Sequence, residues 1–121
     1  MKPTKSSITR KLDKRCSEII RSFGKCMICA LSDYEKLQCC HIFSRTYRNT
    51  RWDLENLLCL CAGCHMGTHR NPIMFTEFVK NHLGEYKYSN LKLKHNAIKR
   101  WTLAEMIDHY NSLGEQYGIL K

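Results

Sequence analysis

The sequence predicts a small α+β fold that is stabilised by zinc, with two short strands and a helix at its centre and helices packed at both ends. Three observations indicate this fold. A chain of 121 residues buries little apolar surface, so a structural metal would add to its stability. Two CxxC pairs can close around one zinc ion, and the spacing of apolar residues alternates between that of helices and that of strands.

Residues 1–25 are predicted to form a basic amphipathic helix over about residues 9–23, with Ser6 or Ser7 capping its start and Gly24 ending it. Its apolar stripe consists of Ile8, Leu12, Cys16, Ile19, Ile20 and Phe23. Eight basic side chains stand against two acidic ones, so residues 1–25 hold +6 of the net charge of +9. This excess favours a nucleic-acid partner over a membrane, with a merely solvated face as the alternative.

Residues 26–71 are predicted to form the centre of the fold. The expected elements, in chain order, are a metal-binding turn at 26–29, a strand at 37–43, a polar loop at 46–55, a strand at 57–60 and a helix from 64 to about 70. On this last helix, His65 and His69 share one face because they are four residues apart.

Residues 72–121 are predicted to form a helical extension that packs on this centre. Pro72 ends the preceding helix, and an apolar stripe predicts another helix over about residues 74–83, stopped by Gly84. A linker rich in Tyr, Asn and Lys follows. The last helix is predicted over about residues 102–117, with an inward stripe of Leu103, Met106, Ile107, Tyr110 and Leu113.

Eight cysteines are also compatible with a secreted disulfide scaffold, but the lysine-rich N-terminus carries no signal peptide. The longest apolar run, residues 57–62, is too short to span a bilayer. We therefore expect a soluble, cytoplasmic protein with reduced thiols and no membrane partner. The sequence leaves the oligomeric state open.

The predicted ligands of a structural zinc ion are Cys26, Cys29, Cys61 and Cys64. Four thiolates complete the tetrahedral coordination of zinc and leave no open position, so this site would support folding rather than chemistry. The alternative is a set of unrelated buried cysteines. Cys16 and Cys39 are expected to pack in the core.

Three further residues lie outside this cage: His41 on the first strand, Asn56 before the second strand and His65 on the following helix. In this order they resemble the three named positions of the HNH endonucleases, and the likeness covers about residues 26–70. The resemblance implies a ββα-metal (HNH) core, which we assign to residues 26–71, and a metal-dependent nuclease activity.

A narrower resemblance extends towards the N-terminus. Leu12-Asp13-Lys14 and Arg51-Trp52-Asp53 are similar to segments of the phage NinG recombination proteins, although His65 stands where an Asn is expected in that group. This resemblance implies an intracellular, phage- or prophage-encoded protein that processes or recombines DNA. Its expected partner is double-stranded or branched DNA.

Phosphodiester hydrolysis needs a base that deprotonates water, and histidine titrates closest to neutral pH, so His41 is the predicted base. His65 and His69 are predicted to hold one divalent ion, Mg²⁺, Mn²⁺, Ni²⁺ or Zn²⁺, that polarises the phosphate. The resemblance implies that Asn56 orients His41. The alternatives are a partly buried polar residue for His41, a turn residue for Asn56 and a metal-free helix surface for the other two histidines.

Cys40 stands where many HNH enzymes carry an Asp or His ligand of the catalytic ion. A thiolate at this position would favour Zn²⁺ over Mg²⁺. The alternative is a small buried residue, because residues 40 and 41 point to opposite faces of a strand.

The residues predicted to bind DNA phosphates are Lys11, Lys14 and Arg15 on the first helix and Arg45, Arg48 and Arg51 in the loop. Arginine suits phosphate because its planar guanidinium donates two hydrogen bonds at once. Trp52 is predicted to lie in the core rather than to stack on a base.

Two other functions are compatible with the sequence. One is a zinc-knuckle nucleic-acid-binding protein without catalysis, which would have no need of His41 opposite a helix with two histidines. The other is a Cys/His-rich protein interaction module, which leaves the basic N-terminus unexplained.

Overall fold

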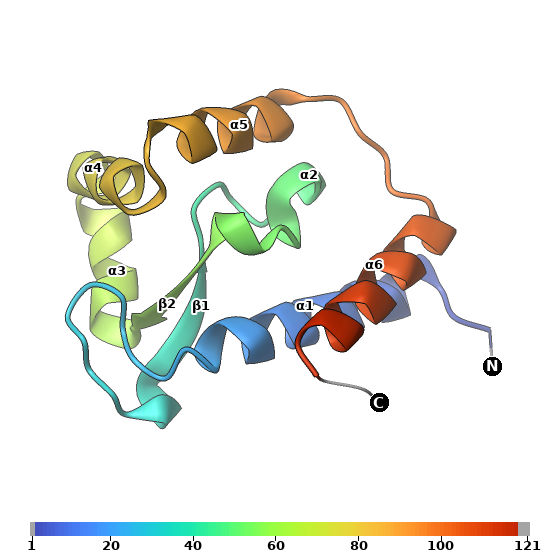
Figure 1. Cartoon of the computed structure of the whole chain (residues 1–121), viewed down its shortest axis with the longest axis horizontal. Coiled ribbons are helices and arrows are strands. Elements are labelled where there is room, and N and C mark those ends of the chain that lie inside the picture. The colour runs from blue at the N-terminus through green and yellow to red at the C-terminus, as the bar shows by residue number, and fades with distance from the viewer. Residues whose placement is uncertain (1, 119–121) are drawn as a thin grey trace.

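The computed structural model describes residues 2–118 and contains a two-stranded sheet surrounded by helices (Figure 1). In chain order, the elements are α1 (Lys5–Arg21), a 3₁₀ turn (Tyr34–Lys36), β1 (Leu37–His41), α2 (Arg48–Arg51), a second 3₁₀ turn (Leu54–Asn56), β2 (Leu57–Cys61), α3 (Ala62–Arg70), α4 (Pro72–Leu83), α5 (Glu85–Asn96) and α6 (Leu103–Gln116). None of the helices formed by residues 2–118 is both long and apolar enough to cross a membrane.

Helix α1 begins earlier than predicted because Thr4, rather than Ser6 or Ser7, caps it. The Thr4 hydroxyl accepts the backbone N–H of Ser7 at 3.1 Å, and the Ser7 hydroxyl accepts the N–H of Thr4 at 3.0 Å. This reciprocal capping box satisfies two backbone donors. The helix ends at Arg21, before Gly24, whose φ of +87° suits a residue without a side chain.

Strands β1 and β2 pair in antiparallel fashion, with His41 opposite Leu57. β1 ends at His41 rather than at the predicted residue 43. The reason is that the backbone N–H and C=O of Phe43 bond the side-chain amide of Asn56 instead of a neighbouring strand. Helix α3 follows β2 directly and packs against both strands, which brings His65 to the same side of the molecule as the end of β1.

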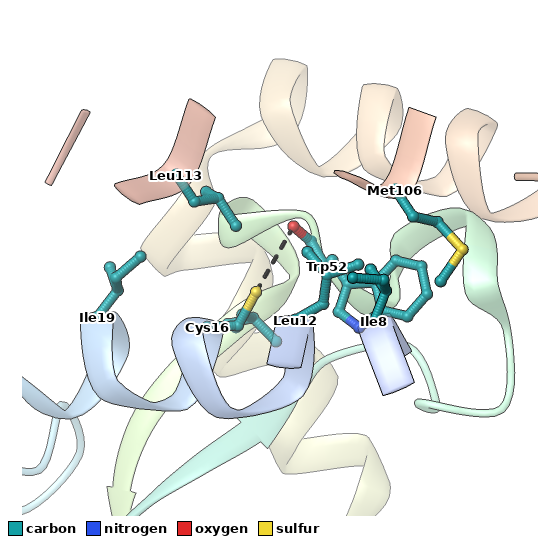
Figure 2. Packing of buried hydrophobic residues seen from close by; sticks show 8 residues of the cluster. Ile8, Leu12, Cys16, Ile19, Trp52, Met106 and Leu113 are labelled. Carbon is teal, nitrogen blue, oxygen red and sulfur yellow. Dashed lines mark hydrogen bonds between the residues drawn. The ribbon is translucent and has the colours of Figure 1, made fainter. Parts of the chain in front are cut away.

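Two hydrophobic clusters hold these elements together. The first lies between α1 and α6 around Trp52, whose 1% exposure confirms its predicted place in the core (Figure 2). Its other buried members are Ile8, Leu12, Cys16, Ile19, Leu57, Met106 and Leu113. The second cluster lies between the sheet and α4, and it contains most of β2, which is buried along its whole length. Helices from the N-terminal and C-terminal parts of the chain therefore cover the sheet.

Helices α4 and α6 agree with the prediction apart from their exact ends. Helix α4 begins at Pro72, whose missing N–H is no loss in the first turn, and ends before Gly84. Helix α6 begins after Thr102, which forms a capping box with Glu105. It buries Met106, as its apolar stripe predicted.

Helix α5 occupies the segment that was predicted to be a linker, so that prediction is wrong. Leu91 is the one buried residue of this helix, which explains its weak apolar pattern. Contacts with the segment around α2 hold it instead. The His95 ring stacks on Phe43 with centroids 4.3 Å apart, and Lys94 donates to the Asp53 carboxylate at 2.9 Å. The apolar periodicity of one segment gives no information about such contacts with distant residues.

Candidate metal centre and active site

The four predicted zinc ligands, Cys26, Cys29, Cys61 and Cys64, come together in the structure. Their sulfur atoms all lie within 4.8 Å of one another, and the Sγ atoms of Cys29 and Cys61 are 3.7 Å apart. Around zinc, Zn–S bonds of about 2.3 Å give a tetrahedron whose S–S edges are about 3.8 Å long. The cluster is therefore positioned to hold a metal ion, and its four thiol donors fit zinc.

Backbone geometry holds the two CxxC segments against each other. The first is fixed to the sheet, because the N–H of Met27 donates to the carbonyl of Cys59 on β2 at 2.8 Å. The second begins at the end of β2, where the Cys61 sulfur accepts the N–H of Cys64 at 3.4 Å and so caps α3. The strand-to-helix junction therefore sets the position of both sulfurs in this segment.

The cysteines differ in how easily they ionise. Burial raises the pKa of the Cys26 thiol, but backbone N–H groups directed at its sulfur, that of Cys29 first, outweigh burial and lower the pKa to about 6. Burial raises the pKa of both Cys16 and Cys39 to about 12. The low pKa of Cys26 agrees with metal ligation, because the thiolate is the metal ligand, whereas burial and the neighbouring cluster sulfurs raise the pKa of Cys64. The high pKa values of Cys16 and Cys39 agree with core packing.

His41 lies at the end of β1, and its Nε2 atom is 3.1 Å from the backbone carbonyl of Arg51. A carbonyl only accepts, so Nε2 carries the proton of the neutral ring and the lone pair is on Nδ1. Burial lowers the pKa of His41 below its ordinary value of 6.5, more strongly than the carbonyl of Arg51 raises it. The neutral ring, which can take up a proton, is thus favoured at neutral pH.

Asn56 is fully buried and joins the two ends of the loop between the strands. Its Oδ1 atom accepts the N–H of Phe43 at 2.8 Å, and its Nδ2 atom donates to the carbonyls of Phe43 at 3.1 Å and Thr50 at 3.0 Å. Thr50 directly precedes Arg51, whose carbonyl accepts from His41. The Asn56 amide therefore fixes the loop that supplies the hydrogen-bond partner of His41.

His65 and His69 lie one turn apart on α3, with ring centroids 5.8 Å apart and planes inclined by 26°. The Nδ1 atom of His65 is 2.8 Å from the side-chain oxygen of Gln38 on β1. This acceptor places the proton of His65 on Nδ1 and leaves Nε2 as a donor for a metal. Two imidazoles on one helix face fit a divalent cation and leave its remaining positions open. Gln38 was missed at the sequence level, because only the strand pairing brings it to α3.

A cavity of about 420 Å³ brings these histidines together. Its lining includes His41 and Arg45, from the end of β1 and the loop after it, and His65 and His69 from α3. The sequence predicted that these residues serve one site, and the structure puts them around one space.

Cys40 also lines this cavity, but it is 2% exposed and belongs to the hydrophobic cluster beneath the sheet. Burial raises the pKa of its thiol to about 11. Among residues 2–118, the four-cysteine cluster is the one set of three or more side chains whose ligand atoms lie close enough for a shared ion, and Cys40 forms no such set with His65 and His69. The structure thus agrees with the alternative of a small buried residue.

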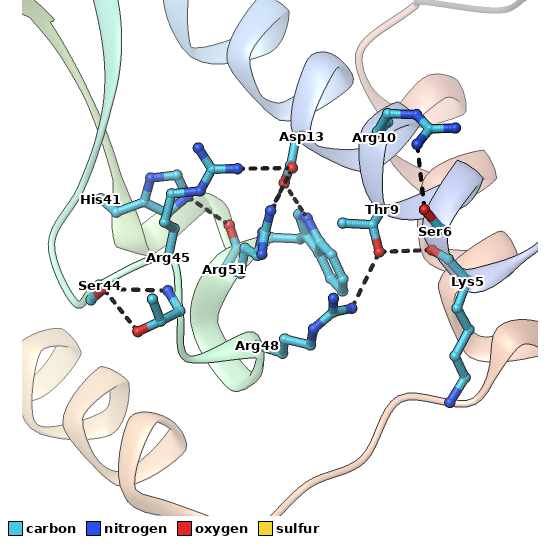
Figure 3. A network of polar contacts seen from close by, with 12 residues as sticks. Lys5, Ser6, Thr9, Arg10, Asp13, His41, Ser44, Arg45, Arg48 and Arg51 are labelled. Atoms are coloured by element: carbon cyan, nitrogen blue, oxygen red, sulfur yellow. Dashed lines mark hydrogen bonds and ion pairs between the residues drawn. The ribbon is translucent and has the colours of Figure 1, made fainter.

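Asp13 on α1 was named from the sequence only as part of a segment similar to the NinG proteins, and no role was predicted for it. Its carboxylate accepts two hydrogen bonds from Arg51, at 3.0 and 2.7 Å, one from Trp52 Nε1 at 2.8 Å and one from Arg45 at 3.3 Å (Figure 3). Burial raises the pKa of Asp13, but the donors from Arg51 and Trp52 outweigh burial and lower it. The signal available in the sequence was one acidic residue among basic neighbours on this helix.

The predicted DNA-binding residues fall into three groups. Lys11, Lys14, Arg45 and Arg48 are exposed, and the Arg45 side chain keeps 61% of its surface. Arg51 keeps only 13%, because Asp13 holds its guanidinium. Arg15 contradicts the prediction: it is 5% exposed, donates to the carbonyl of Tyr110 at 2.9 Å and lies 3.7 Å from the centroid of that ring. Helix α6 therefore covers the part of α1 that carries Arg15, whereas Lys11 and Lys14 stay exposed.

A comparison with protein families gives a match over the central segment of the chain. Residues 26–71 match a family model, HNH_2, described as HNH endonuclease. No curated protein and no solved structure matches the chain. The matched segment contains the four-cysteine cluster together with His41, Asn56, His65 and His69, whereas α1, α4, α5 and α6 lie outside it. The match supports an HNH-type nuclease segment at the centre of this chain.

Proposed function

We propose that this protein is a metal-dependent DNA endonuclease of the HNH type, with a structural zinc ion on its four cysteines. The observation that carries the proposal is the shared cavity, which is lined by His41, by Arg45 and by the two helix histidines, with the Nδ1 atom of His41 left unprotonated by the contact of Nε2 with Arg51. A protein that only binds nucleic acid has no need of this arrangement. The HNH family match over residues 26–71 adds a nucleic-acid substrate and a nuclease activity to this support.

In the proposed mechanism, His41 acts as general base. Its Nδ1 atom takes a proton from water, and the resulting hydroxide forms a bond to phosphorus while the bond from phosphorus to the leaving oxygen breaks. The carbonyl of Arg51 accepts from Nε2 and so holds the ring in the tautomer that this step needs. Asn56 is a positioning residue, because its amide fixes the loop that carries this carbonyl.

The proposed ligands of the catalytic ion are His65 and His69, with Gln38 orienting the His65 ring. A divalent cation bound there supplies Lewis-acid stabilisation of the charge that develops on the phosphate and the leaving oxygen. Mg²⁺, Mn²⁺, Ni²⁺ and Zn²⁺ are the candidates. Arg45 is proposed to grip the scissile strand, because its largely exposed guanidinium lies at the edge of the same cavity.

The proposed biological role is the processing or recombination of phage or prophage DNA, on double-stranded or branched substrates. Support comes from the two segments similar to the NinG proteins. Asp13 in the first segment bonds to Arg51 and Trp52 in the second, so the residues that carry the resemblance also contact one another.

The test is a nicking assay on supercoiled plasmid and on linear and branched duplexes, with each of the four metals added in turn. We expect the native chain to cut at least one substrate with at least one metal, and His41→Ala to lose the activity while still binding DNA. If the native chain binds DNA but cuts nothing under any metal, the endonuclease proposal fails and the non-catalytic binding protein replaces it. Full activity in His41→Ala would instead refute the mechanism.

A further inference from the structure

A second cavity, of about 590 Å³, lies on the side of the molecule where α1 begins. Seven cationic side chains and one carboxylate, that of Asp13, line it. The cationic residues come from three segments that are far apart in the sequence: Lys5 and Arg10 on α1, Arg45, Arg48 and Arg51 after β1, and Lys99 and Arg100 before α6. We refer to these seven residues as the basic surface. So dense a charge of one sign fits a polyanion.

The segment between α5 and α6 is held against α2, which fixes the position of its two basic residues. Trp101 donates from Nε1 to the backbone carbonyl of Arg48 at 3.0 Å and packs edge-on against Trp52 at 5.4 Å. Asn49, the next residue after Arg48, donates to the carbonyl of Lys94 at 3.1 Å and also to that of Ala97. Lys99 and Arg100 are thus held beside Arg48.

Most of the positive charge on this surface is not neutralised. Asp13 is occupied by Arg51 and Arg45, and Lys99 forms a looser pair with Glu105 at 3.8 Å. Within residues 2–118, the ion pairs include none for Lys5, Arg10, Arg48 or Arg100. Hydroxyl groups contact two of these guanidinium groups without neutralising them: Arg48 donates to Thr9 at 3.2 Å and Arg10 to Ser6 at 3.3 Å (Figure 3).

The basic surface is continuous with the histidine cavity. Arg45 lines both cavities, and its guanidinium lies between His41 and Asp13 in Figure 3. A nucleic-acid strand whose reacting phosphate lies beside His41 can therefore pass Arg45 and continue along Arg48 towards the N-terminal turn of α1. Proteins bind such flanking phosphates through arginine and lysine side chains.

We propose that the basic surface binds the backbone phosphates of the DNA strand that flanks the scissile bond, and that Lys99 and Arg100 contribute to it from outside the segment matched by the HNH family. This inference rests on the proposed function for its ligand, DNA. The surface positions the substrate and takes no part in bond breaking. Because each phosphate contact releases condensed counterions, binding depends on salt.

The test measures the affinity of the native chain for a duplex of about 20 base pairs as a function of salt, with cleavage suppressed by leaving out the divalent metal. Two double variants are compared with it, Lys99→Glu/Arg100→Glu and Lys99→Gln/Arg100→Gln. The second guards against repulsion between a new carboxylate and Glu105. The matched control is Lys87→Glu/Lys92→Glu. It changes the net charge by the same amount as the Lys99→Glu/Arg100→Glu pair, but on α5, outside the basic surface.

We expect the Gln pair to raise the Kd by roughly tenfold or more at low salt and to reduce the slope of log K against log salt by about 2, with a larger effect for the Glu pair. The control pair should keep the native slope. The inference would be overturned if both Lys99/Arg100 variants kept the native salt slope. It would also be overturned if the control pair lost as much affinity and slope as they do. Cleavage by the native chain is measured separately, so a chain that binds through this surface but never cuts refutes the proposed function alone.

Discussion

The four-cysteine cluster and the histidine cavity both border the same short sheet, yet they are built differently. In the cluster, four donors converge within 4.8 Å of one another and leave no place for a substrate. In the cavity, His65 and His69 supply two donors to a space of about 420 Å³ that they share with His41 and Arg45. A closed donor set stabilises a fold, whereas an open set leaves room for water and phosphate. The two sites should therefore respond differently to mutation.

The largest expected effect follows loss of a cluster ligand. In Cys26→Ser, one of the four thiolates is removed, and we expect bound zinc to fall from about one ion per chain towards zero, with a loss of about 5 kcal/mol or more in the free energy of unfolding. Metal analysis and thermal unfolding measure the two quantities. Cys39→Ser is the matched control, since this partly buried cysteine lies outside the cluster, and it should keep its zinc. Equal zinc loss in both variants would contradict the division of the cysteines.

The second effect concerns activity and leaves the fold intact. In His41→Ala, the proposed general base is removed, and we expect the cleavage rate to fall by about 10²- to 10⁴-fold, with unchanged zinc content. The control is His82→Ala, because His82 stacks on Phe78 of α4 and does not line the cavity. A comparable rate loss in the control variant would show that the cavity does not define the active site.

The third effect links the two properties through Asn56. In Asn56→Ala, three hydrogen bonds of a fully buried amide are lost, and we expect a destabilisation of about 3 kcal/mol together with a lower kcat, because the loop that orients His41 loosens. Chemical denaturation and steady-state cleavage are the measurements. Asn81→Ala, on the exposed side of α4, should change neither quantity. A stable Asn56→Ala variant with native kcat would remove Asn56 from the mechanism.

A smaller effect is expected for Asp13. Its pKa is lowered in the folded chain, so its contribution to stability is present above the unfolded pKa and is lost as the pH falls through the folded pKa. Asp13→Asn should lower the free energy of unfolding by about 2 kcal/mol at neutral pH and reduce its decline in acid. Denaturant melts across acidic pH provide the test, with the exposed Asp108→Asn as control. If the two variants have the same profile, Asp13 does not tie α1 to the loop.

The smallest expected effect is a shift in a pH profile. Burial lowers the pKa of His41 below 6.5, and the unprotonated ring is the active form in the proposed mechanism. Cleavage should therefore stay on its plateau at neutral pH and fall only as the pH drops below that ordinary value. Single-turnover rates between mildly acidic and neutral pH measure this limb. A midpoint above 6.5 would indicate a different base or a differently placed His41.

Local sequence patterns predicted the four-cysteine cluster and the position of His65 and His69 on one helix face, because CxxC turns and residues four apart on a helix need no knowledge of distant residues. They failed where a partner comes from another part of the chain. Arg15 was predicted to be a surface residue, but in the structure Tyr110 of α6 covers it. Helix α5 has a weak apolar stripe, and its contacts with Asn49 and Phe43 cannot be read from its own sequence. Asp13 and Gln38 likewise acquire their roles only through packing of α1 and α3 against the sheet.

The most direct test of the distinction between the two sites is selective removal of metal. The purified chain is treated with a mild chelator, its residual zinc is measured, and plasmid nicking is followed before and after a divalent metal is restored. We predict that about one zinc ion per chain remains, that nicking stops, and that added metal restores it in the native chain but not in His65→Ala/His69→Ala. The account would be contradicted if the chelated chain, which keeps only this zinc, nicked the plasmid at an undiminished rate. It would also be contradicted if added metal restored nicking in the double variant.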